Sequence, residues 1–159
     1  MITLVLGGAR SGKSEVAESL VDGDVVYVAT ADVGDDADLA ARVRRHRDRR
    51  PPSWTTLEAG PDLAAALRSV PAGRPVLVES VGTWVARSPD LRVDVDDLVA
   101  ALQERTAPTV VVSEEVGLGV HPETEVGRVF RDVVGECNRR IAEAAGDVLL
   151  VVAGRVLRL

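Results

Sequence analysis

Cysteine, lysine and histidine are nearly missing from this chain of 159 residues. Cys137 is the only cysteine, which excludes an intrachain disulfide and any metal site built from several cysteines. Lys13 is the only lysine among 19 basic side chains, and His46 and His121 are the only histidines. The chain also has no basic leader and no apolar run long enough to span a bilayer, so we expect a cytoplasmic protein without membrane insertion.

A broad excess of positive charge is lacking as well. The net charge is −6 and the pI is about 5.0, which argues against sequence-independent binding to nucleic acid. The hydrophobic content of 46% and the charged content of 28% are those of an ordinary soluble globular protein. The length and the lack of a long linker favour one domain over residues 1–159.

Short valine-rich runs alternate with stretches that have helical periodicity. The runs are apolar on both faces, which is typical of parallel strands covered by helices on both sides. We expect strands at 2–6, 25–29, 75–80, 109–113 and 147–153, and helices near 13–21, 36–50, 61–69, 94–105 and 125–145. Pro61 is expected in a first helical turn, Asp35 or Asp36 at an N-cap, and 87–94 as the least structured connection. This order predicts an open, mostly parallel α/β sheet.

The segment GGARSGKS, residues 7–14, follows the first strand and precedes the first helix. Its spacing is that of a phosphate-binding loop, in which glycines let backbone amides converge on phosphate oxygens. Lys13 would neutralise the terminal phosphates of a nucleoside triphosphate, and the Ser14 hydroxyl would bind Mg²⁺. A chain that otherwise uses only arginine keeps lysine here, where a compact ammonium fits better than a planar guanidinium.

Acidic residues follow two later strands at the same expected edge of the sheet. Glu79 ends the run 75–80 and is expected to hold Mg²⁺ or its water shell, although a carboxylate there could instead cap a loop. Glu114 and Glu115 follow the run 109–113 and suggest a site loop or a plain turn. His121 lies in that loop with no ligand pattern around it, and we interpret it as an ordinary loop residue.

His46 lies in the most basic stretch of the chain, RVRRHRDRRPP, at residues 42–52. On a helix, Arg42, Arg49 and Arg50 would share its face. Such neighbours disfavour the imidazolium, keep the ring neutral and nucleophilic, and offer an α-phosphate bidentate donors. A solvated basic helix is the other interpretation, and the residues alone leave both open.

Several motifs, in this order, give the chain a resemblance to a known family. They are GGARSGKS, YVATAD, ARVRRHRDRRPPSWTTLE, VLVESVGTWV, EVGLGVHPE, GRVFRDVVGECNRRIAEAA and VLLVVAG. The set resembles the bifunctional adenosylcobinamide kinase/adenosylcobinamide-phosphate guanylyltransferase family of cobalamin biosynthesis. The resemblance covers nearly the whole chain, and the loop combined with R-x-x-x-H-x-x-x-R-P-x-x-W-x-T-x-E is highly specific.

The resemblance implies a P-loop NTPase-like fold, a cytoplasmic homotrimer and two reactions. Adenosylcobinamide is phosphorylated with ATP or GTP, and GMP is then transferred from GTP to adenosylcobinamide phosphate. A histidine of the family carries the GMP, and His46 occupies its position; Lys13 and Glu79 would complete the catalytic set, with Mg²⁺ on Ser14 and Glu79. The nucleotide-binding residues that the resemblance implies are Gly7, Gly8, Ala9, Arg10, Ser11, Gly12, Lys13, Ser14, Thr30, Ala31, Asp32, Arg47, Asp48, Arg49, Arg50, Glu58 and Glu79.

Three positions depart from the family pattern. Glu114 stands where the family usually has asparagine, and a carboxylate near phosphates is expected to weaken triphosphate binding or to shift the metal. The segment after Trp84 is short, which bears on the pocket for the corrinoid, and arginine replaces the usual final lysine. Two alternative functions are a plain small-molecule kinase and a GTP-binding regulator without catalysis.

Overall fold

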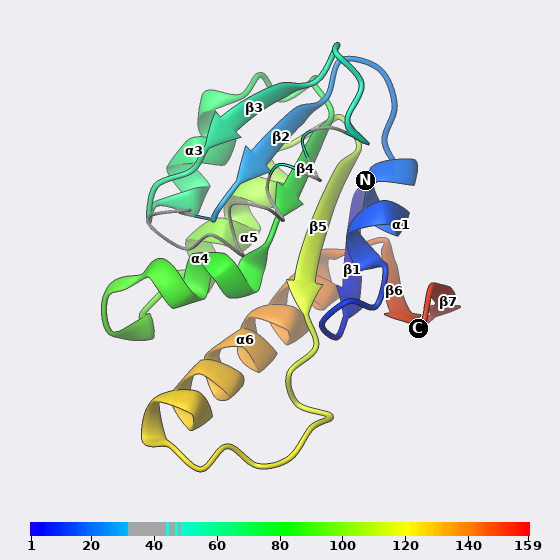
Figure 1. Ribbon diagram of the computed structural model, residues 1–159. Coiled ribbons are helices and arrows are strands. Elements are labelled where there is room, and N and C mark those ends of the chain that lie inside the picture. Colours follow the sequence, from blue (N-terminus) through cyan, green and yellow to red (C-terminus); the bar gives the residue numbers. More distant parts are fainter. Residues whose placement is uncertain (32–43, 45–46, 48) are drawn as a thin grey trace.

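Seven strands form one sheet in the computed structural model, which describes residues 1–31, 44, 47 and 49–159 (Figure 1). The order across the sheet is β3-β2-β4-β5-β1-β6-β7. Every neighbouring pair is parallel except β6 and β7. The bounds are β1 (Ile2–Gly7), β2 (Val26–Ala29), β3 (Thr55–Glu58), β4 (Val76–Glu79), β5 (Thr109–Glu114), β6 (Asp147–Val152) and β7 (Arg155–Arg158).

Helices cover both faces of this sheet. On one face, α1 (Lys13–Ser19) packs Ala17 against Val5, Leu77 and Val112 of the strands. On the other face lie α3 (Leu63–Ser69), α4 (Val81–Arg87), α5 (Val95–Gln103) and α6 (Glu125–Ala144). The prediction of an open, mostly parallel α/β sheet with helices on both faces is therefore confirmed.

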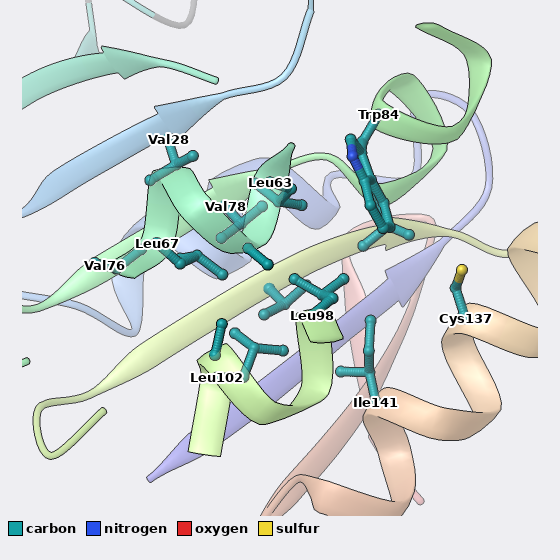
Figure 2. Packing of buried hydrophobic residues seen from close by; sticks show 14 of the residues in the cluster. Val28, Leu63, Leu67, Val76, Val78, Trp84, Leu98, Leu102, Cys137 and Ile141 are labelled. Carbon is teal, nitrogen blue, oxygen red and sulfur yellow. The ribbon is translucent and has the colours of Figure 1, made fainter. Parts of the chain in front are cut away.

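The larger hydrophobic core lies between the sheet and helices α3 to α6. Figure 2 shows Val28, Val76 and Val78 of the strands close to Leu63 and Leu67 of α3, with Leu98 of α5 and Ile141 of α6 nearby. Trp84 is 4% exposed, and its indole Nε1 donates to the Pro61 carbonyl at 2.7 Å. This bond lets α4 bury a large aromatic side chain without leaving its N–H unsatisfied.

Three elements were not expected from the sequence. The edge strand β3 is short and polar, and it lacks the valine-rich signal of the central strands. No helix was expected at the position of α4, and the expected strand 75–80 ended on Ser80, which is the N-cap of α4 and forms a capping box with Thr83. The third is the edge strand β7. Ala153 and Gly154 both have positive φ and close a two-residue turn before it, so the expected strand 147–153 ends one residue earlier.

Smaller expectations were also wrong or fall outside the description. Pro61 does not lie in the first turn of α3, because Asp62 is the N-cap and accepts from the Ala65 N–H. The connection 87–94 contains a short 3-10 helix, η1 (Pro89–Leu91). Arg44, Arg47 and Arg49 are helical, but most of the helix expected at 36–50, with its Asp35 or Asp36 cap, lies outside the described residues. Within the described part of the chain, no helix has the length and apolarity to cross a membrane.

Candidate nucleotide site

The phosphate-binding segment connects β1 to α1, as the sequence predicts. Gly7 is the last residue of β1, and Lys13 is the first residue of α1. A Cβ on Gly7 would lie 2.4 Å from the Ser11 hydroxyl and 2.9 Å from the Val151 carbonyl, so a side chain does not fit there. Gly12, the N-cap of α1, has φ of 92°, a conformation that glycine adopts without strain. The remaining predicted loop residues Gly8, Ala9, Arg10 and Ser11 lie between these two points.

Two loop side chains each lie against a carboxylate from a neighbouring strand. The Ser14 hydroxyl donates to Glu79 Oε1 at 2.7 Å, and Glu79 is the last residue of β4. The Lys13 ammonium lies 3.7 Å from Glu114 Oε1, and Glu114 is the last residue of β5. The strand order places β5 between β4 and β1, so the three carboxyl ends meet at one edge.

Glu114 is held from three sides. Its carboxylate accepts from the Ser80 hydroxyl at 2.9 and 3.1 Å and from the Gly82 N–H at 2.9 Å, both at the start of α4. Its backbone carbonyl accepts from the Asn138 side-chain amide at 3.0 Å. A Cβ on Gly82 would come within 2.2 Å of Glu114 Oε2, so only glycine leaves room for this carboxylate. Ser80 and Gly82 were not predicted as site residues. The Ser-x-x-Thr spacing indicates a helix start at Ser80, but it does not indicate the contact of either residue with Glu114.

Thr30, which follows β2, ties the ends of β2 and β4 together. Its hydroxyl lies within hydrogen-bonding distance of the Glu79 and Ser80 carbonyls, accepts from the Ser80 N–H at 2.8 Å and contacts the Thr83 hydroxyl. The Arg87 guanidinium donates to the Thr30 carbonyl at 2.6 Å. Thr30 is 1% exposed, so it supports the position of Glu79 from within the fold. Ala31, the next predicted site residue, is half-buried.

The last two arginines of the basic segment, Arg49 and Arg50, contact α1 and the strands on the face of the sheet that α1 covers. Arg49 donates to Glu15 at 2.6 Å and to Glu18 at 3.1 Å, both on α1. Arg50 donates to Thr56 and lies 3.8 Å from the centre of the Tyr27 ring. Burial, and next the charge of Glu79, raise the pKa of Tyr27 far above its ordinary value, so this phenol stays neutral.

The other predicted residues of this region are spread more widely. Arg47 is helical and exposed, and Glu58 is exposed at the end of the edge strand β3. Asp32, His46 and Asp48 lie outside the described residues. His121 is exposed, and its Nδ1 lies 2.7 Å from an Arg131 guanidinium nitrogen, within the loop and helix that follow β5.

The oxygen donors at this edge fit Mg²⁺. The Ser14 hydroxyl and the Glu79 carboxylate are hard ligands that already lie 2.7 Å apart. Magnesium sites commonly use one or two protein oxygens together with phosphates and water. The described residues contain no group of three or more histidine, cysteine, aspartate or glutamate side chains that could hold a metal. A metal here would therefore take its remaining ligands from a nucleotide and from water.

A groove of about 760 Å³ opens beside the short segment after Trp84. Its lining comes from η1, from the start of α5 and from α6, and it contains none of the predicted nucleotide-binding residues. The Cys137 thiol lines it, and burial raises the pKa of this thiol to about 11. Cys137 is thus a neutral core residue at ordinary pH.

Comparisons with known proteins agree on one family. Residues 3–159 match the family model described as cobinamide kinase / cobinamide phosphate guanyltransferase. The chain is 38% identical over 176 residues to the bifunctional adenosylcobalamin biosynthesis protein CobU of Escherichia coli (strain K12), covering 97% of each chain. It is 41% identical over 164 residues to the bifunctional adenosylcobalamin biosynthesis protein CobP of Pseudomonas aeruginosa, covering 97% of this chain and 94% of that one.

One solved structure is similar to this chain in its fold only. The flagellar accessory protein FlaH from Methanocaldococcus jannaschii aligns with a TM-score of 0.50 at 16% identity, over 98% of this chain and 74% of that one. The predicted P-loop NTPase-like fold is consistent with the strand order and with this likeness.

Proposed function

Because this chain belongs to the cobinamide kinase / cobinamide phosphate guanyltransferase family, we propose that it performs both reactions of that family at the phosphate-binding loop. It phosphorylates adenosylcobinamide with ATP or GTP, and it then transfers GMP from GTP to the new phosphate. The product is adenosylcobinamide-GDP, an intermediate of cobalamin biosynthesis.

One observation carries this proposal. Lys13 and Ser14, at the start of α1, face Glu114 and Glu79 at the ends of the two neighbouring strands. This edge combines the Lys13 ammonium, the Ser14 hydroxyl and a loop of backbone amides, which is the set that binds a triphosphate. Lys13 would stabilise charge on the terminal phosphates in both reactions. Ser14 and Glu79 would hold Mg²⁺, which screens the phosphate charge when bound.

We further propose that His46 carries the GMP. A neutral ring nitrogen attacks the α-phosphorus of GTP, a nitrogen–phosphorus bond forms, and the bond to the bridging oxygen breaks to release pyrophosphate. The phosphate of adenosylcobinamide phosphate then attacks the same phosphorus, which restores the free imidazole and yields the diphosphate-linked product. Arginines of the segment 42–50 would stabilise the charge on the α-phosphate.

The test uses GTP labelled at the α-phosphate, without acceptor. We expect at most one covalent GMP per chain, on the peptide that contains His46, labile to acid and stable to alkali. His46→Ala should abolish this label and guanylyl transfer while sparing phosphorylation of adenosylcobinamide, and His121→Ala is the matched control. Label on His121, or full transfer by the His46→Ala variant, would overturn the histidine mechanism.

The same experiment separates the alternatives. Transfer of the γ-phosphate without covalent label would indicate a plain kinase, and GTP released unchanged would indicate a non-catalytic regulator. The homotrimer and the cytoplasmic location, which the family resemblance implies, stay predictions. Light scattering of the purified chain measures the first, and cell fractionation measures the second.

A further inference from the structure

Glu114 differs from Glu79, at the end of the neighbouring strand β4, because it faces Lys13, the one lysine of the chain. The Lys13 side chain is 8% exposed, and Glu114 Oε1 lies 3.7 Å from its ammonium. At that distance the two charges attract, but they do not form a hydrogen bond. The ammonium therefore has a nearby negative charge and keeps its capacity to donate to another oxygen.

The position of Glu114 does not depend on Lys13. Ser80 and Gly82 donate to its carboxylate from the start of α4, and Asn138 of α6 donates to its backbone carbonyl. These three donors belong to the framework of the fold. These contacts would therefore remain if Lys13 turned toward a phosphate.

Resting on the proposed function, we propose that Glu114 is a positioning residue that sets how strongly the site binds terminal phosphates. Glu114 stabilises the buried Lys13 ammonium by ion pairing, and this attraction competes with the attraction of the β- and γ-phosphates for the same ammonium. The fixed carboxylate also repels those phosphates. Glu114 thus lowers affinity for a triphosphate and leaves affinity for a monophosphate unchanged.

Removal of this charge should have two linked effects. Without a counter-ion, the buried ammonium destabilises the folded chain, because a charge taken out of water lacks its partner. The phosphates of GTP then supply the missing negative charge, so binding should restore that stability. A purely structural role for Glu114 would lower the thermal stability alone and would leave the ratio of GTP affinity to GMP affinity unchanged.

The experiment is calorimetric titration with magnesium-GTP and with GMP, alongside thermal melts with and without GTP. Glu114→Gln keeps the side-chain length and an acceptor oxygen, and we expect it to bind GTP about tenfold more tightly with GMP unchanged. Glu104→Gln is the matched control, because it removes one exposed carboxylate that pairs with Arg68 on the surface. Its affinities should equal those of the parent chain.

Other outcomes overturn the proposal. Weaker GTP binding by Glu114→Gln would mean that Glu114 assists the nucleotide, for example through a metal. An unchanged ratio of GTP to GMP affinity would mean a structural role only. If Glu114→Gln does not fold, Glu114→Asn, the residue usual in the family, is held to the same criterion. A parent chain that does not bind GTP at all would instead refute the proposed function.

Discussion

Glu79 and Glu114 are the same type of residue at the ends of adjacent strands, yet their surroundings differ. Glu79 accepts from Ser14, the loop hydroxyl that is expected to bind Mg²⁺. Glu114 accepts from Ser80 and Gly82 of α4 and lies near the Lys13 ammonium. If the proposed metal bound at this edge, the contact between Glu79 and Ser14 would have to rearrange, whereas the contacts of Glu114 with α4 would not.

From this difference we propose that the two carboxylates have different tasks at the same sheet edge. A carboxylate whose partner is a prospective metal ligand can exchange that partner for the metal. A carboxylate that α4 holds in place acts instead as a fixed negative charge, which tunes the strength of a neighbouring cation. Four substitutions test this division.

Lys13→Ala should have the largest effect. Loss of the only ammonium at this edge removes charge stabilisation from both reactions, and we expect kcat/KM to fall by about 10³-fold in each. The measurement is steady-state kinetics of phosphorylation and of guanylyl transfer, with circular dichroism to verify folding. Turnover close to that of the parent chain in a well-folded variant would refute the assignment of the phosphate-binding loop.

Glu79→Gln should have the next largest effect. The substitution weakens a ligand or outer-shell partner of Mg²⁺, which typically costs about 10 to 100-fold in metal affinity or activity. We expect the rate to require a higher Mg²⁺ concentration, which a titration of turnover against Mg²⁺ measures. If Glu79→Gln and the parent chain show the same Mg²⁺ dependence, the two carboxylates do not differ in the way described.

Gly82→Ala should displace the Glu114 carboxylate, because the new Cβ would come within 2.2 Å of Oε2. We expect the free energy of unfolding to fall by about 1–3 kcal/mol. In a Glu114→Asn background, the shorter side chain leaves room, so the cost of Gly82→Ala should be smaller. Urea unfolding of the four proteins of this cycle measures the coupling, and strict additivity would contradict the close packing of these two residues.

Ser80→Ala should have the smallest effect. It removes the N-cap of α4 and one donor to Glu114, at a cost of about 1 kcal/mol in unfolding free energy. Ser69→Ala is the control, because that exposed hydroxyl donates to a carbonyl one turn earlier at the end of α3. Thermal melts compare the two variants, and equal losses would mean that the Ser80 hydroxyl has no special role at the edge.

Much of the sheet was predictable from local patterns. The runs that became β1, β2, β4 and β5 are apolar and largely buried, and such runs mark strands covered on both faces. The run that became β6 is equally apolar but only partly buried. The strands that were not predicted lack such a buried, apolar run. The edge strands β3 and β7 have mostly exposed side chains, and α4 begins directly after a strand, with a glycine in its first turn.

The sequence alone was enough to indicate the phosphate-binding loop, because the glycines, Lys13 and Ser14 all belong to one strand–loop–helix unit. The placement of Ser14 and Glu79 at one edge was also predictable, since parallel strands bring their carboxyl ends together. The pairing of Lys13 with Glu114, and the hold of Ser80 and Gly82 on that carboxylate, were not. Those contacts depend on β5 lying between β4 and β1 and on α4 packing against α6. The packing of the whole sheet decides that arrangement, and no local pattern along the chain encodes it.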